Sequence, residues 1–94
     1  MSYPIVPAKF HLGQTVITRN ALDTLEAQSV RTAMLRHMNG DWGEVCDSDC
    51  KSNDHALATE GRLLSVYRDS GGVTFWIITE WDRSVTTVLL PEDY

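Results

Sequence analysis

The residues best suited to chemistry in this 94-residue chain are two cysteines and a histidine in one polar segment. Cys46 and Cys50 are four residues apart, and His55 follows five residues later. Thiolate and imidazole groups are common zinc ligands, and His37 or Asp49 would be candidates for a fourth. Structural zinc sites usually contain two close ligand pairs, whereas this segment offers one. A pair of reduced thiols is therefore the simpler interpretation, and a small metal- or thiol-dependent enzyme that uses Cys46, Cys50 and His55 is the alternative.

A second candidate is the tetrapeptide EWDR, residues 80–83, which lies between two apolar runs. Catalysis by two carboxylates needs them on opposite sides of a substrate cleft, but Glu80 and Asp82 are only two residues apart at a strand end. Aspartate favours turns, because its carboxylate accepts a hydrogen bond from the backbone two residues on. We therefore expect a hairpin turn without catalytic residues. Trp81, Asp82 and Arg83 would then serve recognition, because exposed Trp and Arg are enriched in binding hot spots.

Acidic residues gather between Asp41 and Asp54, with Lys51 as the one basic residue among them. Asp47 and Asp49 lie at the centre of this segment. Such a patch could imitate the phosphates of DNA and occupy the basic groove of a nucleic-acid enzyme. The alternative is a solvated helix start, where acidic side chains interact favourably with the helix dipole.

The overall charge argues against nucleic acid as a direct partner. Eight basic and thirteen acidic residues give a formal net charge of −5, and the arginines are scattered along the chain. No basic stripe is therefore present to neutralise a phosphate backbone. No run approaches the roughly 20 apolar residues of a membrane span, and no signal peptide is recognisable. We expect a cytoplasmic protein with reduced cysteines that acts away from the membrane.

The first elements of the chain are an extended arm and a short strand. Pro4 and Pro7 indicate an extended N-terminal arm over residues 1–8, because proline fixes φ and pushes its preceding residue out of the helical region. Alternating β-branched residues predict a strand over residues 14–19.

Two or three helices are expected in the middle of the chain. Asn20 is a favourable helix cap, and Ser29 offers a second cap for a helix that Gly40 would end in the left-handed conformation. Residues 41–61 begin as a loop and continue as a helix that we expect to end at Gly61.

The last third of the chain is rich in β-branched and aromatic residues. Two short polar breaks divide it into three runs: residues 63–69, 73–81 and 84–91. This pattern is typical of an antiparallel meander. In the middle run Phe75 and Ile77 share one face and Trp76 and Ile78 share the other, so both faces are apolar and the strand should be central. Trp76 is then either covered or part of an exposed patch.

This order of strand, helices and three strands predicts a small single α+β domain over residues 9–94. Its helices would pack on one face of a mostly antiparallel sheet. The end strands of a small sheet need covering, so a homodimer that forms through a strand edge is compatible with the expected fold.

Three segments also resemble a family of small proteins carried by plasmids and phages. They are NGDWGEV, the helix around NDHAL and the C-terminal WIITEWDRSVTTVLLPEDY, and the resemblance covers about residues 9–94. Some members bear the label of a type I restriction endonuclease subunit M. The resemblance implies an accessory protein of a mobile genetic element, a setting in which inhibitors of host restriction or CRISPR systems are common.

These features together favour a non-enzymatic protein that binds another protein, such as a restriction or CRISPR component. No catalytic residue, metal ligand or cofactor is expected. The candidate binding residues lie on the outer face of the sheet, in its turn and in the acidic segment: Trp76, Trp81, Asp82, Arg83, Asp47 and Asp49.

Overall fold

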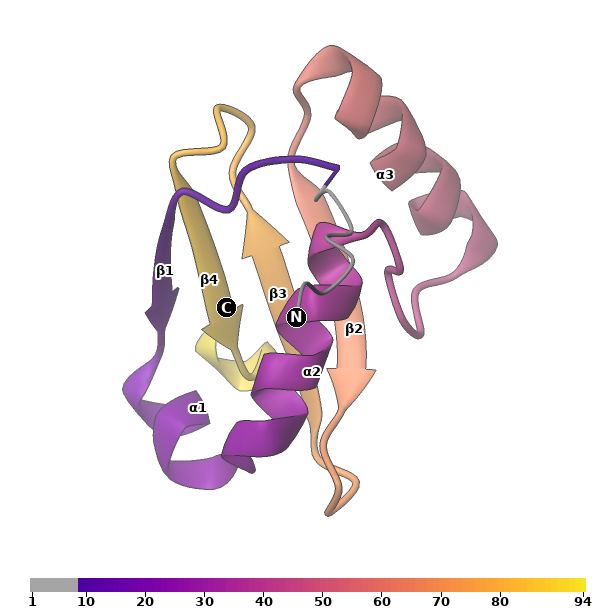
Figure 1. Cartoon of the computed structure of the whole chain (residues 1–94). Helices are drawn as coiled ribbons and strands as arrows, with labels where there is room; N and C mark the ends of the chain where they lie inside the picture. Colours follow the sequence, from indigo (N-terminus) through magenta and orange to yellow (C-terminus); the bar gives the residue numbers. More distant parts are fainter. Residues whose placement is uncertain (1–8) are drawn as a thin grey trace, which may run out of the picture.

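The computed structural model describes residues 9–94, which form a four-stranded sheet and three α-helices (Figure 1). In chain order the elements are β1 (Gln14–Ile17), α1 (Arg19–Thr24), α2 (Ala27–Met38), α3 (Asp47–Thr59), β2 (Leu63–Arg68), β3 (Thr74–Thr79), β4 (Val85–Leu89) and the 3-10 turn η1 (Pro91–Asp93). The expected arm, residues 1–8, lies outside the described residues. Within the described part, no helix has both the length and the apolar character needed to cross a bilayer.

The strand order in the sheet is β1-β4-β3-β2. β2, β3 and β4 pair antiparallel as the predicted meander, and β3 is central. β1 pairs parallel with β4, so the sheet is mixed. A parallel neighbour is possible because all three helices lie between β1 and the meander in sequence, and this long connection lets the chain return in the same direction. The α+β class is confirmed.

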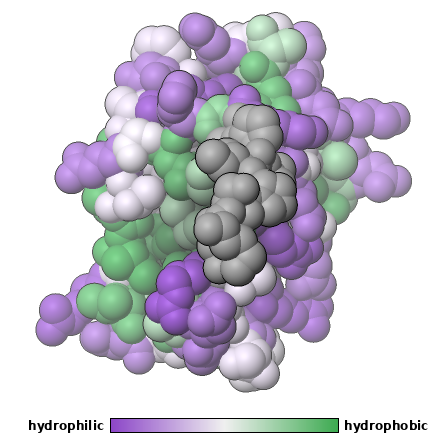
Figure 2. All heavy atoms as spheres, viewed as in Figure 1, coloured by the Kyte–Doolittle hydropathy of each residue, from purple (hydrophilic) through white to green (hydrophobic). Residues whose placement is uncertain are grey.

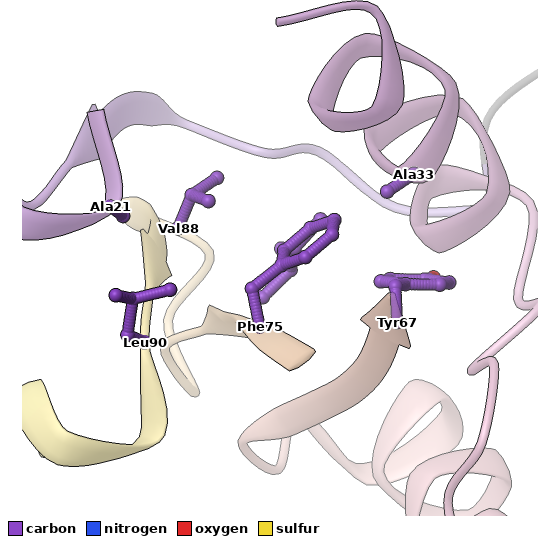
Figure 3. Packing of buried hydrophobic residues seen from close by; sticks show 7 residues of the cluster. Ala21, Ala33, Tyr67, Phe75, Val88 and Leu90 are labelled. Carbon is purple, nitrogen blue, oxygen red and sulfur yellow. The ribbon is translucent and has the colours of Figure 1, made fainter. Parts of the chain in front are cut away.

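The main core lies between the sheet and the helices α1 and α2, and we call the sheet face toward them the inner face. Its buried residues come from both layers: Ala21, Ala33, Tyr67, Phe75, Ile77, Val88 and Leu90. Figure 3 shows the rings of Tyr67 and Phe75 below α2, with centroids 5.8 Å apart. Phe75 and Ile77 are fully buried, as the period-two pattern predicts. Trp76 and Ile78 point to the opposite side, which we call the outer face.

A second, smaller core joins α3 to the β2 side of the sheet. Trp42, Ala56 and Leu63 are buried in it, and Cys50 is among the half-buried side chains that pack against them. The half-buried thiol of Cys50 thus contributes to packing.

The helix starts differ from the expected ones by a few residues. Thr18, not Asn20, caps α1, since its hydroxyl accepts a hydrogen bond of 3.1 Å from the N–H of Ala21. Glu26, not Ser29, caps α2, because its carboxylate accepts hydrogen bonds from two backbone N–H groups of the first turn. Threonine is an ordinary cap, whereas glutamate is unusual in that role.

The helix ends show the same kind of small shift. Gly40 has φ 77 after α2, as expected. α3 ends at Thr59, shortly before the expected end at Gly61, and the residue that follows it, Glu60, is left-handed with φ 61. Gly61 is needed for a different reason, because a Cβ there would lie 2.8 Å from the Cβ of Ala56.

The outer edge of β2 is covered by other parts of the chain. The side-chain amide of Asn53 donates to the carbonyl of Leu64 and accepts from its N–H, at 2.7 and 3.1 Å. Farther along, the backbone of residues 42–44 exchanges two hydrogen bonds with Val66. Gly43 permits this approach, since it has φ 72 and a Cβ there would lie 2.0 Å from the Val66 carbonyl oxygen. This edge cannot accept another strand.

Candidate binding surface on the outer face of the sheet

Residues 80–83 form the predicted turn between β3 and β4. The carbonyl of Glu80 accepts a hydrogen bond of 3.0 Å from the N–H of Arg83, and the N–H of Glu80 donates to the carbonyl of Val85 at 3.0 Å. Asp82 stabilises the turn, because its carboxylate accepts from both the N–H and the hydroxyl of Ser84. The hydrogen bond from the Ser84 hydroxyl is the main reason why the pKa of Asp82 is lowered. The expectation of a turn is confirmed.

Arg83 contacts its own chain through its guanidinium group. Nη1 donates to the carbonyl of Gly61 at 2.6 Å, and Nη2 donates to the carbonyl of Ala56 at 2.9 Å. The side chain therefore holds the end of α3 against the turn. In contrast, the neighbouring Trp81 is 61% exposed and remains available to a partner.

The acidic candidates are exposed in the first turn of α3. Asp47 is the first residue of the helix, and Asp49 follows two residues later. Cys46 occupies the cap position but forms no side-chain cap. Acidic residues at this end interact favourably with the helix dipole, and this position fits the interpretation of the segment as a solvated helix start.

The three residues of the alternative metal or thiol site do not form a metal-binding group among residues 9–94. Cys46 and Cys50 are free thiols, the first exposed and the second half-buried. His55 is exposed in the middle of α3. Nowhere in residues 9–94 do three or more His, Cys, Asp or Glu side chains form a group that could hold a metal ion.

The outer face of the sheet is apolar over its three meander strands. The side chains that alternate onto it are Leu64, Val66, Trp76, Ile78, Val85, Thr87 and Leu89, with the polar pair Arg68 and Thr74 at the end next to the β2–β3 turn. Trp76 is directly opposite Val66 on β2 and Leu89 on β4. It is half-buried, and the ring of Tyr94 meets it edge-on with centroids 5.6 Å apart. The C-terminal residue thus covers part of this face.

A pocket of ≈ 310 Å³ opens on this face between Arg62, Leu64, Trp76, Ile78 and Tyr94. Three of these residues provide an apolar floor. At the rim the guanidinium of Arg62 stacks over the Tyr94 ring at 5.3 Å and donates to the Tyr94 hydroxyl at 2.6 Å. Such a pocket can accept an apolar or aromatic side chain, with polar groups at its rim to bind the backbone that carries it.

Arg62 is also bound to Glu80, whose carboxylate lies 3.3 Å from Nε. The hydrogen bond to Tyr94 is the main cause that raises the pKa of Arg62, and Glu80 adds to it. The rim therefore carries a neutralised ion pair and not a free charge.

Asp93 positions Tyr94 over the pocket. Its carboxylate accepts hydrogen bonds from the hydroxyl of Thr18 at 2.6 Å, the amide of Asn20 at 3.1 Å and the N–H of Leu90 at 3.0 Å. The bond from Thr18 is the main cause that lowers the pKa of Asp93. These bonds tie the C-terminal turn to the start of α1. No periodic pattern in the sequence indicates Arg62, Asp93 or Tyr94, although a proline followed by two acids soon after the last strand is a signal for a short helical turn.

A buried chain of polar side chains lies at the inner face. His37 Nδ1 is 2.5 Å from the hydroxyl of Ser65, and Nε2 is 2.9 Å from the hydroxyl of Thr79. Thr79 is in turn 2.7 Å from Thr86, which donates to the carbonyl of Leu12 at 2.7 Å. Because Thr86 donates to a carbonyl, it accepts from Thr79, and Thr79 must accept from His37. A neutral imidazole with its proton on Nε2 therefore fits the chain, and Ser65 donates to Nδ1.

The contact between Ser65 and His37 resembles a nucleophile with its base, but neither residue has any exposed surface. The rings of Phe10 and Trp42 pack on the imidazole with centroids 5.2 and 5.6 Å away. Burial, with a smaller effect of Arg83, lowers the pKa of His37 to about 4. A substrate cannot reach this pair, so its role is structural.

Of the expected binding residues, Trp76 alone lines a pocket on the outer face, and Trp81 is exposed at the end of the same strand. Asp82 and Arg83 form bonds within the turn and to α3, while Asp47 and Asp49 lie in the first turn of α3. Comparison with known proteins found no matching family model, and no curated protein or solved structure matched the chain.

Proposed function

We propose that this chain is a small non-enzymatic protein that acts by binding another protein through the outer face of its sheet. The observation that carries the proposal is the ≈ 310 Å³ pocket lined by Trp76 and Tyr94. Partner side chains contribute most binding energy where they fill well-packed pockets near the centre of an interface. A sheet face with this pocket and the exposed Trp81 nearby has the composition of an interface.

The positions of the reactive side chains support a non-enzymatic role. His37 and Ser65 are fully buried. Cys46 and Cys50 are free thiols at the cap and in the first turn of α3, a helix that contributes no residue to the pocket. The pocket itself contains an arginine that is paired with Glu80 and an aromatic hydroxyl, and neither is arranged as an acid–base pair.

The proposed partner inserts an apolar or aromatic side chain into the pocket. With a net charge of −5, the chain would associate fastest with a basic partner, because opposite charges steer the encounter. The resemblance to proteins of mobile genetic elements suggests a component of host restriction or CRISPR systems. We therefore propose that the chain inhibits such a component in the cytoplasm.

The test is quantitative affinity capture from the native host with matched baits. Trp76→Ala removes part of the apolar floor of the pocket, and Leu35→Ala shortens a side chain on α2 that is 62% exposed. Both variants must first show the circular dichroism spectrum of the wild type. A protein captured by wild type and Leu35→Ala but lost with Trp76→Ala would then be purified and its dissociation constant measured. We expect at least a tenfold weaker complex with Trp76→Ala.

The acidic surface is tested in the same experiment. The double substitution Asp47→Lys and Asp49→Lys reverses the charge of the first turn of α3 and leaves the pocket intact. Binding that survives Trp76→Ala but is lost on this charge reversal would reject the outer face and support the acidic surface. Binding that resists both changes would reject both surfaces.

A further inference from the structure

The outer edge of β1 has no strand partner within residues 9–94. The N–H groups of Gln14 and Thr18 donate to β4 or its preceding residue, at 2.9 and 3.0 Å. Backbone groups alternate in direction along a strand, so those of Thr15 and Ile17 face away from β4. Among the described residues, nothing bonds their N–H and C=O groups, which form a row of donors and acceptors along the edge.

This edge differs from the opposite edge of the same sheet. β2 is covered by Asn53 and by the backbone of residues 42–44. The sequence of β1, QTVI, contains no charged residue and no proline, which are the residues that usually protect an exposed edge. Val16 at its centre is 39% exposed. Within residues 9–94, the chain therefore blocks one edge and leaves the other able to pair.

An apolar groove runs along the inner side of this free edge. One pocket of ≈ 200 Å³ lies between β1 and α2, and a second of ≈ 230 Å³ lies between α1 and α2. The two pockets share Ile17 and Val30, with Met34 at one end and Leu22 at the other. Figure 2 shows hydrophobic surface at the lower left, where Figure 1 places β1 and α1. A strand added to β1 would cover this groove.

We infer that the strand which pairs with β1 is β1 of a second copy of the chain, antiparallel about a two-fold axis at Val16. In that register Thr15 of each copy is opposite Ile17 of the other, and these pairs exchange backbone hydrogen bonds through the groups that face outward. Val16 is opposite itself on the outer face. On the inner face a small side chain meets a large one in both pairs.

The absence of charge on β1 allows a second copy to approach at this edge. Two chains of net charge −5 repel each other over most of their surfaces, and the uncharged strand β1 is a place where they can meet. The nearest ion pair on α1, between Arg19 and Asp23 at 3.4 Å, is neutral as a unit. The interface is isologous, so one unprotected edge is sufficient for both copies and the assembly stops at a dimer.

The dimer would contain one continuous sheet formed by the strands of both copies. Both outer faces would then lie on the same side, so two Trp76 pockets would face a partner together. This consequence would apply only if the proposed function is correct, whereas the dimer itself does not depend on it.

The first test is the oligomeric state of the full chain by sedimentation equilibrium over a wide range of concentrations. Val16→Lys places two like charges at the two-fold axis, and Leu35→Lys introduces the same charge at an exposed apolar position on α2. We expect a dimer for wild type and for Leu35→Lys, and a monomer for Val16→Lys with an unchanged circular dichroism spectrum.

The second test is disulfide cross-linking in chains that carry Cys46→Ser and Cys50→Ala. The proposed register places the two Val16 Cα atoms about 4.5 Å apart, which is within the range that a disulfide can bridge. We expect Val16→Cys to form a covalent dimer on mild oxidation and Leu35→Cys to remain monomeric.

A monomer at every concentration would overturn the inference, and so would a dimer that persists in Val16→Lys. Hydrogen exchange distinguishes the reasons for a monomer. Protected amides at Thr15 and Ile17 in a monomer would mean that residues of the same chain cover the edge, and rapid exchange would mean that it stays open.

Discussion

Arg83 Nη2 donates a hydrogen bond of 2.9 Å to the carbonyl oxygen of Ala56, which joins the turn between β3 and β4 to the end of α3. A second bond of 2.6 Å reaches the carbonyl of Gly61. Arg83 has φ 60, a conformation that normally favours glycine. The two hydrogen bonds give a reason for an arginine at this position, since glycine would fit the backbone but leave the helix end unbound.

Replacement of Arg83 should separate the effect of its side chain from the strain of its backbone. Arg83→Ala loses the bonds to α3 and keeps a strained conformation, so we expect the free energy of unfolding to fall by about 2 to 3 kcal/mol. Arg83→Gly loses the same bonds but relieves the strain, and should be about 1 kcal/mol more stable than Arg83→Ala. Urea denaturation measures both values.

The control for this comparison is Arg19→Ala, which removes an arginine from an exposed ion pair on α1. That change should alter the free energy of unfolding by less than about 0.5 kcal/mol. Equal stabilities of Arg83→Ala and wild type, which share the strained backbone, would show that the contacts with α3 contribute nothing.

The pH dependence of stability should report the burial of His37. Its pKa is about 4 in the folded chain and about 6.5 in an unfolded one. Between these values the unfolded chain binds a proton that the folded chain does not bind, so stability falls as the pH drops from about 6.5 to about 4. The full effect is about 3 kcal/mol, and it is absent above pH 6.5. Denaturation midpoints measured across this range provide the test.

His37→Gln should remove this pH dependence, because glutamine does not titrate. His55→Gln, at an exposed position on α3, is the matched control and should retain it. Carboxylates also titrate near the lower end of the range, so the difference between wild type and His37→Gln is the quantity to compare. An identical pH profile for these two proteins would contradict the burial of a neutral imidazole.

Two adjacent threonines on β4 test the two faces of the sheet. Thr86 is fully buried and bonds Thr79 and the carbonyl of Leu12, whereas Thr87 is half-buried on the outer face. Thr86→Val keeps the shape but leaves buried polar groups unpaired, and should lower the free energy of unfolding by about 2 kcal/mol. Thr87→Val should be neutral or slightly stabilising, because valine favours strands. Thermal or urea unfolding of the two variants measures these changes. Equal losses of unfolding free energy in both variants would contradict the assignment of Thr86 to the inner face and Thr87 to the outer face.

The meander was predictable because its signals are local. Period-two alternation places Phe75 and Ile77 on the inner face and Trp76 on the outer face, and a turn follows from the aspartate at position 82. The parallel pairing of β1 was not predictable in this way, since its partner Val85 lies far along the chain and no turn connects them. Long-range strand register depends on packing that short windows of sequence do not contain.

The candidate site was predictable only in part for a related reason. Trp76 is recognisable as an apolar residue on the second face of a central strand. Arg62 and Tyr94 form the rim of its pocket only because the chain end folds back over the sheet, which a pattern within either segment does not indicate. His37 has the spacing of a helix core residue, but its partners Ser65 and Thr79 lie on two different strands. Side-chain partners that come from distant elements have no periodic signal.

The contact of Tyr94 with Trp76 should depend on Asp93, which ties the C-terminal turn to Thr18. Asp93→Ala removes that tie, so we expect Tyr94 to move away and the pocket to open. The measurement is the NMR shift of the Trp76 indole N–H, which the Tyr94 ring affects while the two are in contact. Glu92→Ala, an exposed acid in the same turn, is the control and should leave the shift unchanged.

Acid should act on the same contact as the substitution of Asp93. The pKa of this carboxylate is lowered in the folded chain, chiefly by the hydrogen bond from Thr18, so the ionised form stabilises the turn. That stabilisation is complete above the ordinary pKa of an aspartate and is lost as the pH falls through the lowered value. The indole shift of Trp76 in the wild type should therefore approach that of Asp93→Ala only in strong acid. A shift that already matches the variant at neutral pH would show that Asp93 does not hold Tyr94 in place.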